Sequence, residues 1–275
     1  MKNSILVLLC TAVVVWSGCS SAPKALNEPP QPAEELYREA MSLFVRGNYI
    51  DSYAIFQKCR SRYPINEWGI KSELKVADCQ YFQKQYATAL IQYQEFARLH
   101  PTYEYSDYVQ YQIGMCSYKQ LCTIDRDQSF ARNGAKQFER FISLFPGSPY
   151  VPSAMEKLEE CKRRIAEHVL YIANYYYKTG AYPSALRRYQ EARESHFEYL
   201  ARPDLLILQQ GKTYLRLNDP DRARDEFILL VKNYPESPYA VQAQDLLEDA
   251  EKIKEMDKVK ATGIFGELNP FNDEE

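Results

Sequence analysis

The sequence has few of the residues that carry chemistry at enzyme active sites. Histidine occurs only at positions 100, 168 and 196, never in the H-E-x-x-H pattern of zinc proteases, and no glycine-rich phosphate loop or G-x-S-x-G turn is present. Cys161 and His168 are seven residues apart. On a helix this spacing separates them by about 10 Å, beyond the reach of a nucleophile and its base. We therefore predict that the protein is not an enzyme and uses no cofactor or metal.

Charge and hydropathy exclude two further classes of protein. The net charge of −3 and the isoelectric point of about 5.8 argue against a nucleic-acid-binding surface. Beyond the N-terminus, no apolar run approaches the about 20 residues that a membrane-spanning helix needs. We expect neither a nucleic-acid partner nor a spanning helix.

The N-terminus is organised like a secretion signal. Lys2 supplies a positive charge, and Ser4 to Trp16 form an apolar run of thirteen residues. Such a run is too short to span a bilayer and suits the core of a signal peptide. Small residues, Ser17 and Gly18, then precede Cys19. We predict that residues 1–18 are a signal peptide.

Residues 17–21 resemble the lipobox of bacterial lipoproteins, although Trp16 stands where the lipobox usually has an aliphatic residue. The resemblance implies that Cys19 becomes the N-terminus and carries fatty acids, which anchor the protein to a membrane. Ser20 after the cysteine fits the sorting of enteric lipoproteins to the outer membrane. An ordinary signal peptide with an unrelated cysteine is the alternative. Residues 19–33 contain four prolines and no apolar period, which predicts a flexible tether behind the lipid.

Five cysteines follow Cys19, and an odd number argues against a complete disulfide framework. We expect most of them to be buried as small apolar side chains. A disulfide between Cys116 and Cys122, which are close in sequence, remains an alternative.

An internal repeat predicts the fold. Each of five units has a small residue, then a second small residue, then an aromatic residue four positions later. The first small residues are Ala40, Ala77, Gly114, Ala173 and Gly211, the second are Ser52, Ala89, Gly134, Ala185 and Ala223, and the aromatics are Phe56, Tyr93, Phe138, Tyr189 and Phe227. The two small residues are twelve positions apart in four units and twenty apart in the third, which implies an insertion of eight residues there.

This spacing suits two antiparallel helices that cross at small side chains, with an aromatic ring filling the space beside the crossing. Proline closes most units, because it cannot continue a helix. The pattern is that of the tetratricopeptide repeat (TPR). We predict an all-α, right-handed α-solenoid of about five TPR-like helix pairs, with units one to three in residues 34–147, units four and five in 148–258, and a disordered or partner-ordered tail in 259–275.

The expected helices follow from the repeat and its turns. They lie near residues 33–46, 50–62, 67–83, 87–99, 104–119, 129–144, 150–179, 183–197, 203–217, 220–233 and 237–258.

Several motifs, together with the lipobox and the insertion, resemble the BamD family, the TPR lipoproteins of the outer-membrane β-barrel assembly machinery. The matching segments are Asp125-Arg126-Asp127-Gln128, Phe145-Pro146-Gly147-Ser148-Pro149-Tyr150, Ala173-Asn174-Tyr175-Tyr176 and Gly180-Ala181-Tyr182. The resemblance covers roughly residues 33–250. The chain departs from the pattern at His196-Phe197-Glu198, where a Tyr-Pro ending is usual, and Gly263-Ile264-Phe265-Gly266 matches no motif of the family.

The resemblance implies a non-catalytic scaffold, lipid-anchored in the outer membrane and facing the periplasm. Its expected partners are the barrel assembly subunit, held by the C-terminal repeats, and accessory lipoproteins of the machinery. The N-terminal repeats are expected to bind the C-terminal signal of unfolded outer-membrane proteins. The alternative is a TPR envelope lipoprotein that docks peptidoglycan enzymes or a cell-division complex.

Helical offsets give candidate groove residues. On each first helix, the positions −6, −3 and +1 from the small residue are expected to turn toward the concave side of the solenoid. In units one to three they are Glu34, Tyr37, Met41, Lys71, Leu74, Asp78, Tyr108, Tyr111 and Met115. Aromatic and methionine side chains suit a short segment with alternating apolar residues. For Leu74 and Tyr111, packing between repeats is an equally weighted alternative.

A basic group in the last helix pair supplies candidates for the partner interface: Arg216, Arg222, Arg224 and Lys232. Exposed charges of this kind set the rate and orientation of association. The alternative is that they are solvated helix charges with no partner.

Overall fold

The structure, a computed structural model, describes residues 31–261, and its regular elements there are helices. In chain order they are α1 (Ala33–Val45), α2 (Tyr49–Arg62), α3 (Glu67–Phe82), α4 (Tyr86–Leu99), α5 (Ser106–Tyr118), α6 (Ser129–Leu144), α7 (Val151–Lys178), α8 (Tyr182–His196), the short 3₁₀ helix η2 (Phe197–Tyr199), α9 (Pro203–Arg216), α10 (Pro220–Asn233) and α11 (Pro238–Ala261). The long helices match the eleven predicted ones, and nearly all ends agree within one residue.

The turn inside a helix pair forms at a residue with positive φ. Gly47 and Gly180 have φ of 80°, and Lys84 and Asn218 take the same place in units two and five with φ of 62° and 57°. Glycine adopts this left-handed conformation without cost, and asparagine tolerates it better than most residues. Local side-chain caps then start the next helix, as at Asn48, whose Oδ1 accepts a hydrogen bond from the Asp51 backbone N–H at 3.3 Å.

The predicted small and aromatic positions form the contact inside each pair. All five aromatic rings are fully buried. A Cβ added at Gly114 would lie 2.7 Å from the Phe138 ring, and one added at Gly211 would lie 2.5 Å from the Phe227 ring. Both distances are below van der Waals contact, so these glycines are needed for the ring to lie flat against the first helix. The repeat register is confirmed.

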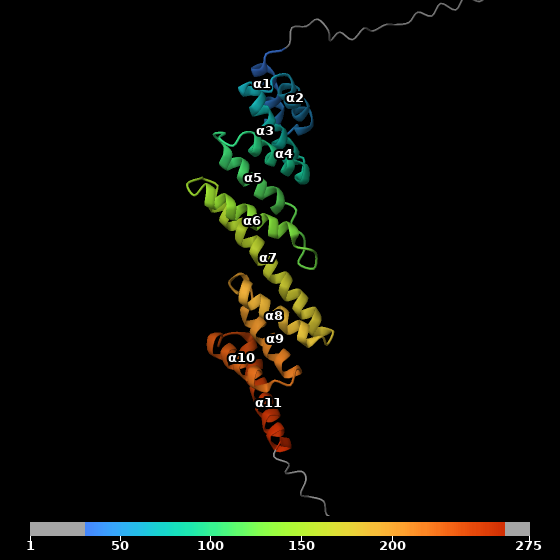
Figure 1. The fold of residues 1–275 in the computed structure, drawn as a ribbon, viewed down its shortest axis with the longest axis vertical. Coiled ribbons are helices and arrows are strands. Elements are labelled where there is room, and N and C mark those ends of the chain that lie inside the picture. The colour runs from blue at the N-terminus through green and yellow to red at the C-terminus, as the bar shows by residue number, and fades with distance from the viewer. Residues whose placement is uncertain (1–30, 262–275) are drawn as a thin grey trace, which may run out of the picture.

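The pairs stack into a single elongated array. Figure 1 shows α1 and α2 at one end, α11 at the other, and each helix packed against its neighbours in the chain. The long helix α7 passes between the two halves, since its N-terminal part packs on α6 and its C-terminal part on α8. Ala173, near the C-terminal end of α7, belongs to unit four, as predicted.

The insertion in unit three is a loop between α5 and α6 that α7 holds in place. Arg164 Nη1 donates to the Cys122 carbonyl at 2.8 Å, and His168 Nδ1 lies 2.6 Å from the Ile124 carbonyl oxygen. Gln128, which is 1% exposed, donates through Nε2 to the carbonyls of residues 123 and 126. His168 therefore contacts the inserted loop.

Two ends of the predicted domains need correction. The helical array continues to Ala261, so the first three residues of the predicted tail are helical. Gln31 in the predicted tether already contacts the domain, because its carbonyl accepts a hydrogen bond from the Tyr63 hydroxyl at 2.8 Å. The signal peptide, Cys19 and the tail from 262 lie outside the described residues. The five cysteines in residues 31–261 are all free, so the alternative disulfide between Cys116 and Cys122 does not form.

Candidate functional site

A hollow of about 350 Å³ opens on the first helices of units one to three. We call it the N-terminal hollow. Side chains from α1, α3, α5 and the loop before α5 line it: Tyr37, Lys71, Leu74, Lys75, Tyr103, Tyr105 and Tyr108. Four of these seven are tyrosines and two are lysines. The hollow thus offers aromatic rings, hydroxyl groups and two ammonium groups to a bound segment.

Asp78 is buried beneath the hollow and bonds to two of its lining residues, Tyr108 and Lys75. Its side chain is 1% exposed and accepts three hydrogen bonds: from the Tyr93 hydroxyl at 2.6 Å, the Tyr108 hydroxyl at 2.8 Å and Lys75 Nζ at 2.7 Å. A fully paired buried carboxylate fixes the orientation of its donors. Tyr108 and Lys75 are therefore held in place before any ligand binds.

The same position explains a pattern in the repeat. In unit four, Asn174 stands where Asp78 stands in unit two, and it accepts a hydrogen bond from the Tyr189 hydroxyl at 2.7 Å. The units whose aromatic residue is phenylalanine have Met41, Met115 or Lys212 at this position. A hydrogen-bond acceptor therefore follows the small residue only where the aromatic has a hydroxyl group to pair.

The protonation states in the hollow are set by burial and by Asp78. Burial raises the pKa of Tyr37, and it raises the pKa of Tyr103 to about 12, so both hydroxyls stay neutral near pH 7. For Lys75, burial works to lower the pKa, but the charge of Asp78 and its hydrogen bond outweigh burial and raise it. The pKa of Lys71 is raised by its hydrogen bond to Glu67. Both ammonium groups are charged at neutral pH.

Four of the predicted groove residues meet in the N-terminal hollow: Tyr37, Lys71, Leu74 and Tyr108. Three lining residues were missed, namely Lys75, Tyr103 and Tyr105. Lys75 lies two residues before Ala77, which is outside the −6, −3 and +1 offsets. The two tyrosines lie on the loop between α4 and α5, and the repeat register does not place loop residues.

The +1 positions do not line the hollow, so this offset needs correction. Asp78 is fully buried and Met115 is 8% exposed, while Met41 packs in the core of unit one. The reason is the aromatic residue of the second helix, which packs over the first helix near the +1 position, as the pairing of Asp78 with Tyr93 shows. These side chains complete the contact within a pair and do not line the hollow.

Tyr111 and Glu34 also lie away from the lining. The Tyr111 ring stacks on Tyr150 with centroids 5.0 Å apart, and its hydroxyl lies 3.0 Å from Ser153 Oγ, so it packs between units as the alternative held. Glu34 forms a 2.7 Å ion pair with Arg38 on the surface of α1.

The basic candidates at the C-terminal end do not form one cluster. Arg222 pairs with Asp219 at 2.6 Å and lies over the Tyr214 ring, and Arg216 lies 6.0 Å from the centre of the Tyr182 ring. Lys232 is ten residues after Arg222 on α10, about 15 Å along the helix. Arg216 and Arg222 lie on either side of the turn between α9 and α10, and their side chains contact different rings.

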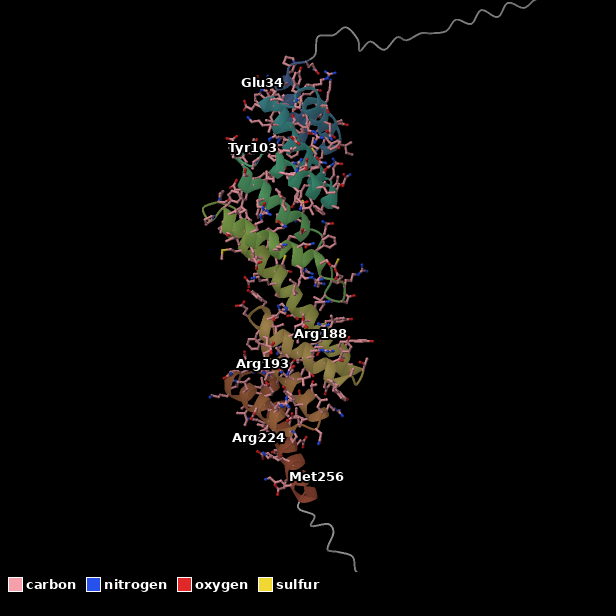
Figure 2. The ribbon with its side chains drawn as sticks, viewed as in Figure 1. Glu34, Tyr103, Arg188, Arg193, Arg224 and Met256 are labelled. Atoms are coloured by element: carbon pink, nitrogen blue, oxygen red, sulfur yellow. The ribbon has the colours of Figure 1, made fainter. Side chains whose placement is uncertain are left out.

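Arg224 faces the last helix. Its Nε lies 3.7 Å from Glu251 Oε1 on α11, and Lys254 of α11 pairs with Asp221 of α10 at 2.5 Å. Figure 2 shows Arg224 near the C-terminal end of the array, far from Glu34 and Tyr103 at the N-terminal end. The two sets of candidates thus belong to opposite ends of the molecule.

Comparison with known proteins gives consistent matches. A family model described as "Outer membrane lipoprotein" (YfiO) matches residues 29–226, more than half of the chain. Relatives named outer membrane protein assembly factor BamD include those of Caulobacter vibrioides, 25% identical over 88% of this chain and 79% of its own, and Vibrio cholerae, 29% identical over 76% and 90%. The Neisseria meningitidis serogroup A protein of that name is 27% identical over 76% of this chain and 82% of its own.

In residues 31–261, no helix is both long enough and apolar enough to cross a membrane, and no three side chains of histidine, cysteine, aspartate or glutamate are grouped as a metal site.

The helix pairs, their shared register and the family model, which spans the four N-terminal units and the start of the fifth, agree with one another. The chain belongs to the YfiO family of outer membrane lipoproteins.

Proposed function

We propose that this protein is a non-catalytic scaffold of the machinery that assembles β-barrel proteins in the outer membrane. The relatives named outer membrane protein assembly factor support this over the docking of peptidoglycan enzymes. Lipidation at Cys19 would hold the repeats at the periplasmic surface of the outer membrane. An array of helix pairs suits this task, because each pair contacts only its neighbours and different regions can hold different partners.

The N-terminal hollow is the proposed site for unfolded outer-membrane proteins, with their C-terminal signal as the bound segment. Tyrosine rings suit the apolar side chains of a strand-forming segment. The charged Lys71 and Lys75 suit the carboxylate that ends such a segment. The observation that supports this most directly is the pairing of Asp78 with both Tyr108 and Lys75, because it orients an aromatic group and a cation in advance.

A peptide-binding measurement tests the N-terminal site. A fluorescent peptide from the C-terminus of an outer-membrane β-barrel protein is titrated with the lipoprotein in detergent. We expect Lys71→Ala and Tyr108→Ser each to weaken binding about fivefold or more, a change of about 1 kcal/mol. Lys136→Ala, which removes an exposed lysine of α6 outside the hollow, is the matched control. Equal affinity in all four proteins would refute the assignment.

The C-terminal repeats are the proposed site for the barrel assembly subunit, through Arg216 and Arg222, with Arg224 and Lys232 further along α10. Reversal of Arg222 and Arg224 to glutamate is expected to release the subunit. However, Arg224→Glu also brings two carboxylates together at Glu251, which would loosen α11. Arg222→Gln with Arg224→Gln removes the positive charges without that repulsion, so this pair of variants separates loss of binding from loss of packing.

Co-purification of the barrel assembly subunit is the measurement for the C-terminal site. We expect the glutamine variant to lose the subunit while Lys71→Ala keeps it. Retention by the glutamine variant would contradict the C-terminal assignment. Loss in both would contradict the division of labour between the two ends.

A further inference from the structure

At two of the four junctions between repeat units, an arginine links one second helix to the next. The arginine stands eight positions after the small residue of its own second helix. Its partner stands three positions after the small residue of the next second helix. Arg60 Nη1 donates to Gln92 Oε1 at 3.3 Å between units one and two. Arg193 Nη1 donates to both carboxylate oxygens of Glu226 at 2.6 Å between units four and five. At both junctions an arginine closes the space between the helices.

Ala97 takes the place of this arginine between units two and three. The position it would reach is Gln137, whose Oε1 accepts a hydrogen bond from Gln110 Nε2 at 3.1 Å instead. A methyl group cannot fill the volume of a guanidinium, and a hollow of about 330 Å³ remains among α4, α5 and α6. Its polar lining includes Gln94, Arg98, Gln110, Gln137 and Arg140.

A second hollow of about 180 Å³ continues from the first, since Ala97, Gln110 and Arg140 line both. Its other walls are mostly apolar and include Phe96, Val109, Leu144 and Phe145. Leu144 is 54% exposed, so its side chain is accessible to a bound segment. We call the two hollows together the junction groove. It is basic and polar at one end and apolar at the other.

The junction groove is lined by basic residues and not by acidic ones. No aspartate or glutamate is among the residues that line either hollow in the described chain. Arg98 forms a 2.6 Å ion pair with Glu95, which is not among the lining residues. Within residues 31–261, Arg140 is exposed and makes no ion pair or hydrogen bond of its own. The two guanidinium groups would repel an incoming arginine, whereas the free N–H donors of Arg140 match a carboxylate.

We propose that the junction groove binds an acidic and apolar linear segment of a partner protein. An aspartate or glutamate of the segment pairs with Arg140, and a neighbouring aliphatic or aromatic side chain packs against Leu144 and Phe145. The site is separate from the N-terminal hollow. Gln110 and Tyr108 differ by two residues on α5, which turns them about 200° apart around the helix.

Selection from a displayed library of random twelve-residue peptides tests the proposal. The bait is the full lipoprotein in detergent micelles. The library is depleted beforehand on the Ala97→Arg variant, which introduces the arginine found between units one and two and between units four and five. We expect enriched peptides to carry an aspartate or glutamate within a few residues of a large apolar side chain. An enriched peptide is then synthesised with a fluorescent label for titration.

In the titration we expect Ala97→Arg and Arg140→Glu each to weaken binding about tenfold or more. Arg140→Gln is a second variant, since it changes an exposed side chain and leaves packing intact. Lys136→Ala on the same helix and Lys71→Ala in the N-terminal hollow should bind like the parent. The proposal is overturned if no sequence is enriched, if enriched peptides lack an acidic residue, or if Arg140→Gln binds as tightly as the parent.

Discussion

Removal of the Asp78 carboxylate should lower the free energy of unfolding of the N-terminal repeats more than any surface substitution does. Asp78→Ala leaves the hydroxyl of the buried Tyr93 and the half-buried Lys75 without their acceptor. Hydrogen bonds to a charged group contribute about 1.5–3 kcal/mol each, and breaking a buried ion pair from one side costs about 3–5 kcal/mol. Because these contributions overlap, we expect a loss of about 3–5 kcal/mol in the free energy of unfolding of this region.

Graded variants at Asp78 separate its charge from its role as an acceptor. Asp78→Asn keeps an oxygen for the two tyrosines, as Asn174 does in unit four, and should cost only about 1–2 kcal/mol. Asp78→Met combined with Tyr93→Phe reproduces the residues of units one and three. This double variant should be more stable than Asp78→Met alone, with a coupling of about 1–3 kcal/mol between the two positions.

Urea unfolding of the chain from Ser20 measures these effects. Trp68 on α3 is then the sole tryptophan, since Trp16 is removed, so its fluorescence reports on units one and two. A local probe matters, because a repeat array need not unfold in one step. The reasoning would be refuted by an Asp78→Ala chain within about 1 kcal/mol of the parent, or by effects at Asp78 and Tyr93 that simply add.

Three further predictions concern the rest of the chain. Ala77→Leu should force α3 and α4 apart at a cost of about 1–3 kcal/mol, whereas Ser42→Leu on the exposed side of α1 should leave the unfolding midpoint almost unchanged. Cys19→Ala should abolish cleavage after residue 18 and labelling by radioactive fatty acid in cells; normal labelling would end the lipoprotein assignment. Asp204 accepts a 2.7 Å hydrogen bond from Ser237, and although burial opposes this, its bonds with Arg202, Ser237 and a backbone N–H hold its pKa below the usual value. Stabilisation from this group is therefore complete above the unfolded pKa of about 3.9 and lost as the pH falls below it. The protection factors of the α11 amides, which compare the observed exchange rate with the intrinsic rate at each pH, should therefore fall on acidification below about pH 4. They should fall less in Asp204→Asn.

The sequence by itself determined the helices and the contact inside each pair. Small residues and a ring four positions later can recur in one register only if the same two helices cross in the same way each time, so the pattern contains the local geometry. The acceptor at Asp78 could also have been predicted from the sequence. It occurs with Tyr93 in unit two, just as Asn174 occurs with Tyr189 in unit four.

Only the tertiary structure decided which side chains line the N-terminal hollow. Three offsets on one helix cover much of its surface, and the neighbouring helices select among them: the second helix covers Met115, while Lys75, left out of the prediction, reaches the N-terminal hollow. Tyr103 comes from a loop, whose path depends on the two helices it joins. The gap at Ala97 has the same origin, because alanine is ordinary in a helix. Its consequence appears only when the packed helices are compared with the preceding junction, where Arg60 occupies the equivalent position.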